Sequence, residues 1–148
     1  MLADVLTVSR TTVSLDQGDK TSVLRAMAEL FAEEGVGLDA STVLRVFLER
    51  EALACTGIGS GVAIPHGRIA GVAEVRAALG IHRAGVSFDA VDGQPVHILV
   101  GVLAPDSAPS QHLRTLAEIS RRLRDDAVRA SLVGAADSAT AYRILTAP

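Results

Sequence analysis

The feature that most restricts the fold of this sequence is an almost unbroken apolar run from Val96 to Leu103, interrupted only by His97 and Gly101. A strand with one face in solvent alternates apolar and polar residues, whereas a strand covered on both faces reads as a continuous apolar run. The run therefore predicts the central strand of a sheet that has a layer of structure on each side.

Three further segments carry strand patterns. Residues 12–15 alternate between polar and apolar side chains and predict a short strand, and residues 62–64 form a short apolar segment that ends at Pro65. Residues 75–81 place apolar side chains at every second position, which predicts a strand with one buried face. Asp92-Gly93 is a turn signal between this strand and the central one.

Helical patterns fill most of the remaining chain. Asp19 and Asp39 are candidate N-caps of two helices, the first ending at Gly35 and Gly37 and the second at about Ala54. Further helices are predicted over residues 110–124, 127–133 and 137–146. Since no internal repeat or linker separates these elements, we expect a single α/β domain over residues 1–148, with a mixed central β-sheet flanked by helices on both faces.

Composition excludes several classes of protein. The formal charge is −3 without any Lys/Arg-rich block, which argues against nucleic-acid binding. The single cysteine, Cys55, cannot form an internal disulfide or a Cys-rich zinc site. Asp4 interrupts the only apolar N-terminal stretch, and no apolar run reaches the roughly 20 residues of a membrane helix, so we expect a cytoplasmic protein without membrane insertion.

Two residues are unexpected in apolar stripes. The second helix has an inward stripe of Val43, Val46, Phe47, Arg50 and Leu53, and the helix over residues 110–124 has one of His112, Leu116, Ile119 and Leu123. The planar guanidinium of Arg50 suits phosphate oxygens, and His112 near a helix N-terminus could donate to an anion. Each also has a structural interpretation: Arg50 could reach solvent beside the helix C-terminus, and His112 could be a hydrogen-bonded, partly buried histidine.

The third candidate is His66, which follows Pro65 and the glycine-rich segment over residues 56–61. Glycines allow backbone amides to approach an anion closely, and a neutral imidazole is a nucleophile near physiological pH. The same local pattern is equally typical of a turn histidine beside a structurally required proline. Other chemistry lacks its motifs: no metal-type histidine pair, dinucleotide fingerprint, P-loop or serine-nucleophile elbow occurs, and His82 and His97 fall in strand patterns.

Longer segments resemble a known family. Residues 50–53 (Arg-Glu-Ala-Leu) and 56–67 (Thr-Gly-Ile-Gly-Ser-Gly-Val-Ala-Ile-Pro-His-Gly) resemble the active-site signature of the enzyme IIA family of the fructose, mannitol and nitrogen-regulatory phosphotransferase systems. Residues 88–96 resemble the hairpin before that family's central strand, and residues 112–116 resemble its second-histidine helix. The resemblance spans roughly residues 12–146.

The resemblance implies a role for each matching residue. His66 matches the histidine that is phosphorylated by HPr, the small histidine-containing carrier protein, or by its nitrogen-branch counterpart. His112 matches the second active-site histidine, and Arg50 matches an arginine that helps to bind the phosphoryl group. We expect backbone amides of Thr56, Gly57, Gly59 and Gly61 to contribute phosphate contacts, with no metal or cofactor required. Cys55 stands where the family often has Ser or Thr, which puts a hydroxyl contact there in doubt.

The resemblance leaves the downstream role open. The expected donor is an HPr-type phosphocarrier, and the acceptor is a regulatory target protein or a IIB domain. The nitrogen-regulatory branch is favoured, because the sequence carries no fused IIB, IIC or carrier domain. The alternatives are a fructose/mannitol-type IIA component that passes phosphate to a IIB transporter domain, and a purely regulatory protein-binding module.

Overall fold

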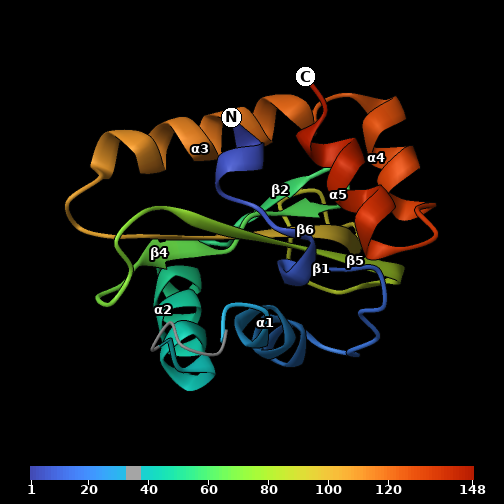
Figure 1. Ribbon diagram of the computed structural model, residues 1–148. Coiled ribbons are helices and arrows are strands. Elements are labelled where there is room, and N and C mark those ends of the chain that lie inside the picture. Colours follow the sequence, from blue (N-terminus) through green and yellow to red (C-terminus); the bar gives the residue numbers. More distant parts are fainter. Residues whose placement is uncertain (33–37) are drawn as a thin grey trace.

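A computed structural model describes residues 1–32 and 38–148 and shows a sheet between two layers of helices (Figure 1). Helices α1 (Lys20–Glu29) and α2 (Ala40–Leu53) cover one face. Helices α3 (Pro109–Arg122), α4 (Asp126–Val133) and α5 (Ser138–Thr146) cover the other. The predicted α/β class, with a mixed sheet and helices on both faces, is confirmed. The predicted end of the first helix at Gly35 and Gly37 is wrong, because α1 already ends at Glu29; the two glycines themselves lie outside the described residues.

The sheet has six strands, preceded by two short 3-10 helices, Leu2–Asp4 and Val8–Arg10. The strands are β1 (Thr11–Thr12), β2 (Gly57–Gly59), β3 (Val62–Ala63), β4 (His66–Arg68), β5 (Arg76–Val86) and β6 (Val96–Ala104). Their order is β1-β5-β6-β3-β2, and β4 also pairs with β6. The pairs β1/β5, β3/β6 and β4/β6 are parallel, whereas β5/β6 and β2/β3 are antiparallel, so the sheet is mixed.

Strand β6 is the central strand that its apolar run predicts. Its side chains alternate between two hydrophobic cores: Ile98, Val100 and Val102 belong to one, and Leu99 and Leu103 to the other. Each of these five side chains is at most 1 % exposed. Burial of such a side chain contributes about 1.5–3 kcal/mol, so β6 anchors both layers of the fold.

Strand β5 departs from the prediction of one buried face, because both of its faces are covered. On the face where the sequence has only polar or small residues, Ala78 is buried as completely as Leu79, and Gly80 is buried as well. A Cβ atom at Gly80 would lie 2.5 Å from Leu15 and 2.6 Å from the sulfur of Met27. The small residues therefore make room for α1 and the segment before it.

The N-terminal strand also differs from its prediction, since β1 is Thr11–Thr12 rather than residues 12–15. The chain still follows β5 beyond β1, because the backbone N–H of Leu15 donates to the carbonyl of Ile81 at 3.1 Å. The two predicted N-caps are confirmed: the carboxylates of Asp19 and Asp39 accept from the backbone N–H groups of Ser22 and Ser41.

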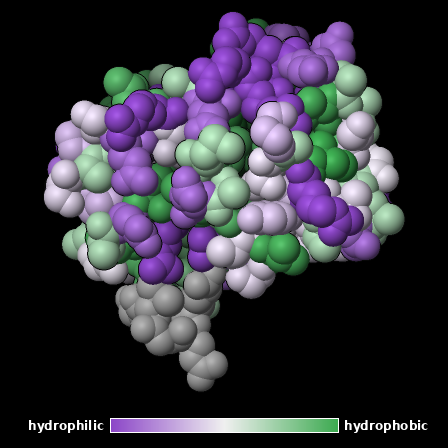
Figure 2. All heavy atoms as spheres, turned by 45° about the horizontal axis from the view of Figure 1, so that its top comes forward, coloured by the Kyte–Doolittle hydropathy of each residue, from purple (hydrophilic) through white to green (hydrophobic). Residues whose placement is uncertain are grey.

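The exposed face of the α3–α5 layer carries mainly hydrophilic residues, interrupted by small apolar areas (Figure 2). This distribution agrees with the amphipathic pattern of α3, in which Ile119 is buried and Arg121 is exposed. Within the described ranges, none of the helices combines the length and the apolar character needed to cross a bilayer.

Candidate functional site

The backbone around Pro65 fixes the position of His66. Strands β3 and β4 lie in line along the same side of β6, and the carbonyl of Pro65 between them accepts from the N–H of Val102 at 2.9 Å. His66 therefore begins a strand instead of lying in a turn after one. The neighbouring Gly67 lacks a side chain, and a Cβ atom there would overlap Val46 of α2. This close packing brings the last turn of α2 beside His66.

An open cavity of about 630 Å³ lies where α2, β4 and α3 meet. Its lining includes Arg50 and Leu53 from α2, His66 and Arg68 from β4, and His112 and Leu113 from α3. The structure thus brings together the three side chains singled out as catalytic candidates, although they are distant along the chain. The inward stripe predicted for α2 is confirmed for Val43 and Phe47 but is wrong for Leu53, which is 82 % exposed because it borders the cavity rather than the core.

The ring of His66 has a defined orientation. Its Nδ1 lies 2.7 Å from the carbonyl oxygen of Ile64. Because a carbonyl only accepts, Nδ1 carries the proton and Nε2 of the neutral ring carries the lone pair. Burial lowers the pKa of His66 below 6.5, and the Arg50 guanidinium acts in the same direction against the opposing effects of the Ile64 carbonyl and Glu51. The neutral, nucleophilic form is therefore favoured near neutral pH.

His112 faces the same space from α3. Its ring centroid lies 5.8 Å from that of His66, at an interplanar angle of 74°. Burial lowers the pKa of His112 below 6.5, with further contributions from His66 and Arg68. Within the described part of the chain, its buried Nε2 has no hydrogen-bond partner. A buried polar atom without a partner is costly, so this nitrogen is suited to bind an incoming group.

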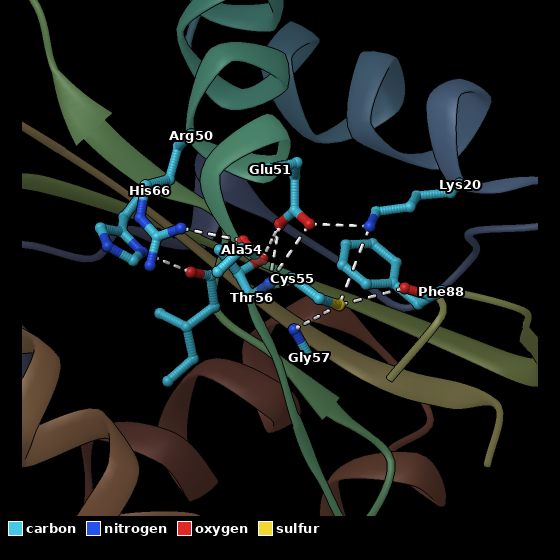
Figure 3. Close-up of polar contacts among 10 residues, drawn as sticks. Lys20, Arg50, Glu51, Ala54, Cys55, Thr56, Gly57, His66 and Phe88 are labelled. Carbon is cyan, nitrogen blue, oxygen red and sulfur yellow. Dashed lines mark hydrogen bonds and ion pairs between the residues drawn. The ribbon is translucent and has the colours of Figure 1, made fainter. Parts of the chain in front are cut away.

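Arg50 lies beside His66 at the end of α2 (Figure 3). Its Nη1 donates to the carbonyl oxygen of Ala54, the C-cap of the helix, at 2.9 Å. This contact is the C-terminal anchoring expected from the structural interpretation of Arg50. The guanidinium also lines the cavity, and its pairing with Ala54 uses only one of its five N–H donors. The structural and the anion-binding interpretations are therefore compatible.

The structure does not bring the glycine-rich segment to this cavity. Thr56 donates through both its N–H and its hydroxyl to the carboxylate of Glu51, and the N–H of Gly57 points to the sulfur of Cys55 at 3.3 Å. Gly59 and Gly61 have φ values of 92° and 78°; Gly59 ends β2 and Gly61 lies in the turn that leads to β3. Their conformational freedom is used for that turn, and none of the four residues lines the cavity.

Glu51 and Lys20 were not singled out from the sequence. Glu51 follows Arg50 but turns away from the cavity, and its side chain is only 6 % exposed. Its carboxylate pairs with the ammonium group of Lys20 at 2.8 Å in addition to holding Thr56. For Glu51, the signal in the sequence was its place inside the motif of residues 50–53. Because Glu51 lies off the apolar stripe of α2, however, its side chain is expected to face solvent.

The thiol of Cys55 makes contacts that a hydroxyl could also make. Its sulfur donates to the carbonyl of Phe88 at 3.2 Å and accepts from the N–H of Gly57. The thiol of Cys55 therefore provides a hydrogen-bond partner for two backbone groups, the carbonyl of Phe88 and the N–H of Gly57.

The site is a paired-histidine site: one histidine lies on a short strand of the mixed sheet, and the second lies on a helix that faces it. The chain belongs to the family described as "Phosphoenolpyruvate-dependent sugar phosphotransferase system, EIIA 2", which it matches over residues 4–147. The resemblance drawn from residues 50–53 and 56–67 is thereby confirmed, and the chain is a phosphotransferase-system EIIA-type domain.

Relatives and solved structures agree with this assignment. The chain is 38 % identical to a nitrogen regulatory protein of Pseudomonas aeruginosa over 144 residues, which cover 97 % of this chain and 94 % of that protein. The crystal structure of nitrogen regulatory protein IIA-Ntr from Neisseria meningitidis matches with a TM-score of 0.91 at 32 % identity, covering 98 % of this chain and 99 % of that one. A fructose-specific EIIABC component of Bacillus subtilis is 30 % identical over 90 % of this chain but only 21 % of its own length.

Proposed function

We propose that this chain is a cytoplasmic phosphohistidine carrier that accepts a phosphoryl group on Nε2 of His66 from an HPr-type phosphocarrier protein. The observation that carries the proposal is the hydrogen bond from Nδ1 of His66 to Ile64, because it leaves the Nε2 lone pair free in a ring that lines the cavity. Arg50 and His112 line the same cavity, so cationic and neutral donors are available to the phosphoryl oxygens.

The transfer step follows from this arrangement. The Nε2 lone pair of His66 attacks the phosphorus in line, the bond from phosphorus to the donor's histidine nitrogen breaks, and its electron pair returns to the donor ring. Phosphorylation of Nε2 makes the His66 ring cationic while Nδ1 keeps its proton, so the Ile64 carbonyl stabilises the product. Arg50 and the Nε2–H tautomer of His112 hold the equatorial oxygens, and catalysis consists of positioning and charge stabilisation.

The rim of the cavity is suited to a protein donor. Leu53 and Leu113 lie on opposite sides of the cavity and are 82 % and 71 % exposed. Large apolar side chains in such positions are typical of protein-interaction sites. A phosphoryl group carried on another protein's histidine can reach the open cavity only if that protein docks on this rim.

For the acceptor, we propose a regulatory target protein and nitrogen-type regulation. Two nitrogen regulatory proteins, from Pseudomonas aeruginosa and Neisseria meningitidis, match this chain over almost their full length, at 38 % and 32 % identity. The second candidate is transfer to a IIB domain. It is favoured by a fructose-specific EIIA component of Haloferax volcanii, which is 31 % identical over 88 % of its own length.

The test is phosphoryl acceptance by a His66→Ala variant incubated with enzyme I, the HPr-type carrier and labelled phosphoenolpyruvate. We expect no labelling, with a circular dichroism spectrum like that of the unchanged protein, because the substitution lies at the wall of an open cavity. His97→Gln is the matched control, since His97 bonds the backbone of His82 away from the cavity, and it should label normally. Undiminished labelling of His66→Ala would refute the proposed site.

A further inference from the structure

A closed cluster of polar groups lies behind the cavity, on the other side of the α2 C-terminal turn (Figure 3). The ammonium group of Lys20 pairs with Glu51 at 2.8 Å and lies over the ring of Phe88 at 4.6 Å from its centroid. Glu51 in turn accepts from the N–H and the hydroxyl of Thr56. The side chains of Lys20 and Glu51 are 23 % and 6 % exposed, so this ion pair is largely removed from solvent.

The cluster continues to His66 through the backbone of two residues, Thr56 and Ile64. The carbonyl of Thr56 accepts from the N–H of Ile64 at 3.0 Å. The carbonyl of Ile64 accepts from Nδ1 of His66 at 2.7 Å. Polar contacts and the backbone of Thr56 and Ile64 thus connect the ammonium group of Lys20, through Glu51, to the imidazole of His66. Each contact restrains the backbone that makes the next one, so the contacts together fix the geometry around His66.

We infer that Lys20 and Glu51 are positioning residues that hold the Ile64 carbonyl against Nδ1 of His66 and so keep its Nε2 free. The inference rests on the proposed function of His66 and adds residues that touch neither the phosphoryl group nor its donor. Glu51 is suited to this role because it follows Arg50 in sequence. Arg50 holds the carbonyl of Ala54 and Glu51 holds the N–H of Thr56, so consecutive residues of α2 brace both ends of a three-residue segment.

Charge gives the pair a second effect that a purely structural contact would lack. Among the described residues, the charged or titratable groups around His66 are Glu49, Arg50 and Glu51 of α2, Arg68 of β4 and His112 of α3. The negative charge of Glu51 acts to raise the pKa of His66, and the Lys20 ammonium group offsets that charge. Loss of the Glu51 charge should therefore lower the pKa of His66, and loosening of the Ile64 contact acts in the same direction.

The experiment is nuclear magnetic resonance of the ring nitrogens of His66 in the ¹⁵N-labelled full chain, without any phosphoryl donor. In Lys20→Met and Glu51→Gln the ratio of the Nε2–H to the Nδ1–H tautomer should rise about fivefold, the factor that corresponds to weakening one hydrogen bond by about 1 kcal/mol. The pKa of His66, followed in the same spectra, should shift downward in Glu51→Gln, because the loss of the negative charge and the weaker Ile64 contact act in the same direction. Lys20→Arg should restore the tautomer ratio of the unchanged protein.

The control is Asp126→Asn, which removes the ion pair with Arg129 on α4, outside the series of contacts, and should leave the His66 signals unchanged. If Glu51→Gln does not fold, Thr56→Val, which deletes only the hydroxyl contact, and Lys20→Met should still shift the tautomer ratio. An unchanged tautomer ratio in folded Lys20→Met and Thr56→Val would overturn the inference. Because these signals are read without transfer, they remain interpretable even if His66→Ala proves to accept phosphate.

Discussion

The two sides of the last turn of α2 differ in how completely their polar groups are paired. On the closed side, the carboxylate of Glu51 meets an ammonium group, an N–H and a hydroxyl, and is almost removed from solvent. On the open side, Arg50 lines a cavity of about 630 Å³ and Nε2 of His112 lacks a partner among the described residues. The difference indicates two roles: the fully paired groups maintain the geometry of the site, and the incompletely paired groups are available to bind the phosphoryl group.

The largest expected effect concerns stability on the closed side. Glu51→Ala would leave the ammonium group of Lys20 and both donors of Thr56 without their acceptor. We expect a loss of about 3 kcal/mol in the free energy of unfolding, measured by urea denaturation. The matched control is Glu49→Ala on the same helix, whose pair with Arg45 is exposed and should contribute less than about 0.5 kcal/mol. Equal losses in the two variants would remove the distinction between the two sides.

The next effect concerns transfer on the open side. Arg50→Ala removes the cationic fork from the cavity, and we expect phosphoryl acceptance to slow about tenfold to a hundredfold, since a hydrogen bond to a charged group is worth about 1.5–3 kcal/mol. Rapid-quench measurement of labelled protein would give the rate. Arg45→Ala, an exposed arginine on the same helix, should transfer at the normal rate. An unchanged rate in Arg50→Ala would exclude this residue from the site.

His112→Leu should separate function from stability. The substitution removes a buried nitrogen that has no partner in the described structure, so the free energy of unfolding should rise by about 1 kcal/mol. The same change removes one donor to the phosphoryl oxygens and should slow acceptance about tenfold. Parallel denaturation and transfer assays test both outcomes, and a loss of stability would show that His112 is a structural residue.

The smallest effect is a dependence on pH. Because the pKa of His66 in the folded protein lies below 6.5, its ring stays neutral under conditions in which a solvent-exposed histidine is already half protonated. The rate of acceptance should therefore persist as pH falls through 6.5 and decline only at lower pH. The unfolded chain binds this proton more readily, so stability should decline as pH falls below 6.5. A rate that is half-maximal above pH 6.5 would contradict the role of burial.

The sequence predicted the scaffold because the signals for it are local. The apolar run of β6 and the caps Asp19 and Asp39 each report a preference of their own segment, and the structure confirms them. The sequence did not predict that both faces of β5 are buried, because Ala78 and Gly80 are not typical core residues unless α1 packs against them. A small residue indicates a close contact between two elements only when the second element is known.

The candidate site was predictable in part for the same reason. His66, Arg50 and His112 were found because they interrupt expected patterns or match a long motif, and the structure places all three at one cavity. Lys20 and Glu51 were missed because charged residues off an apolar stripe are ordinarily solvated, and their pairing depends on two helices meeting. The positive φ angles of Gly59 and Gly61 serve a hairpin turn, which an inventory of glycines cannot distinguish from an anion-binding loop.

The most direct test of the account is the position of the phosphorus atom in the phosphorylated protein, read from couplings between phosphorus and the histidine ring nitrogens in ¹⁵N-labelled chain. The hydrogen bond between Nδ1 of His66 and the Ile64 carbonyl predicts a single phosphorus attached to Nε2 of His66, with Nδ1 still protonated. A phosphorus attached to Nδ1 of His66, or to either nitrogen of His112, would contradict it.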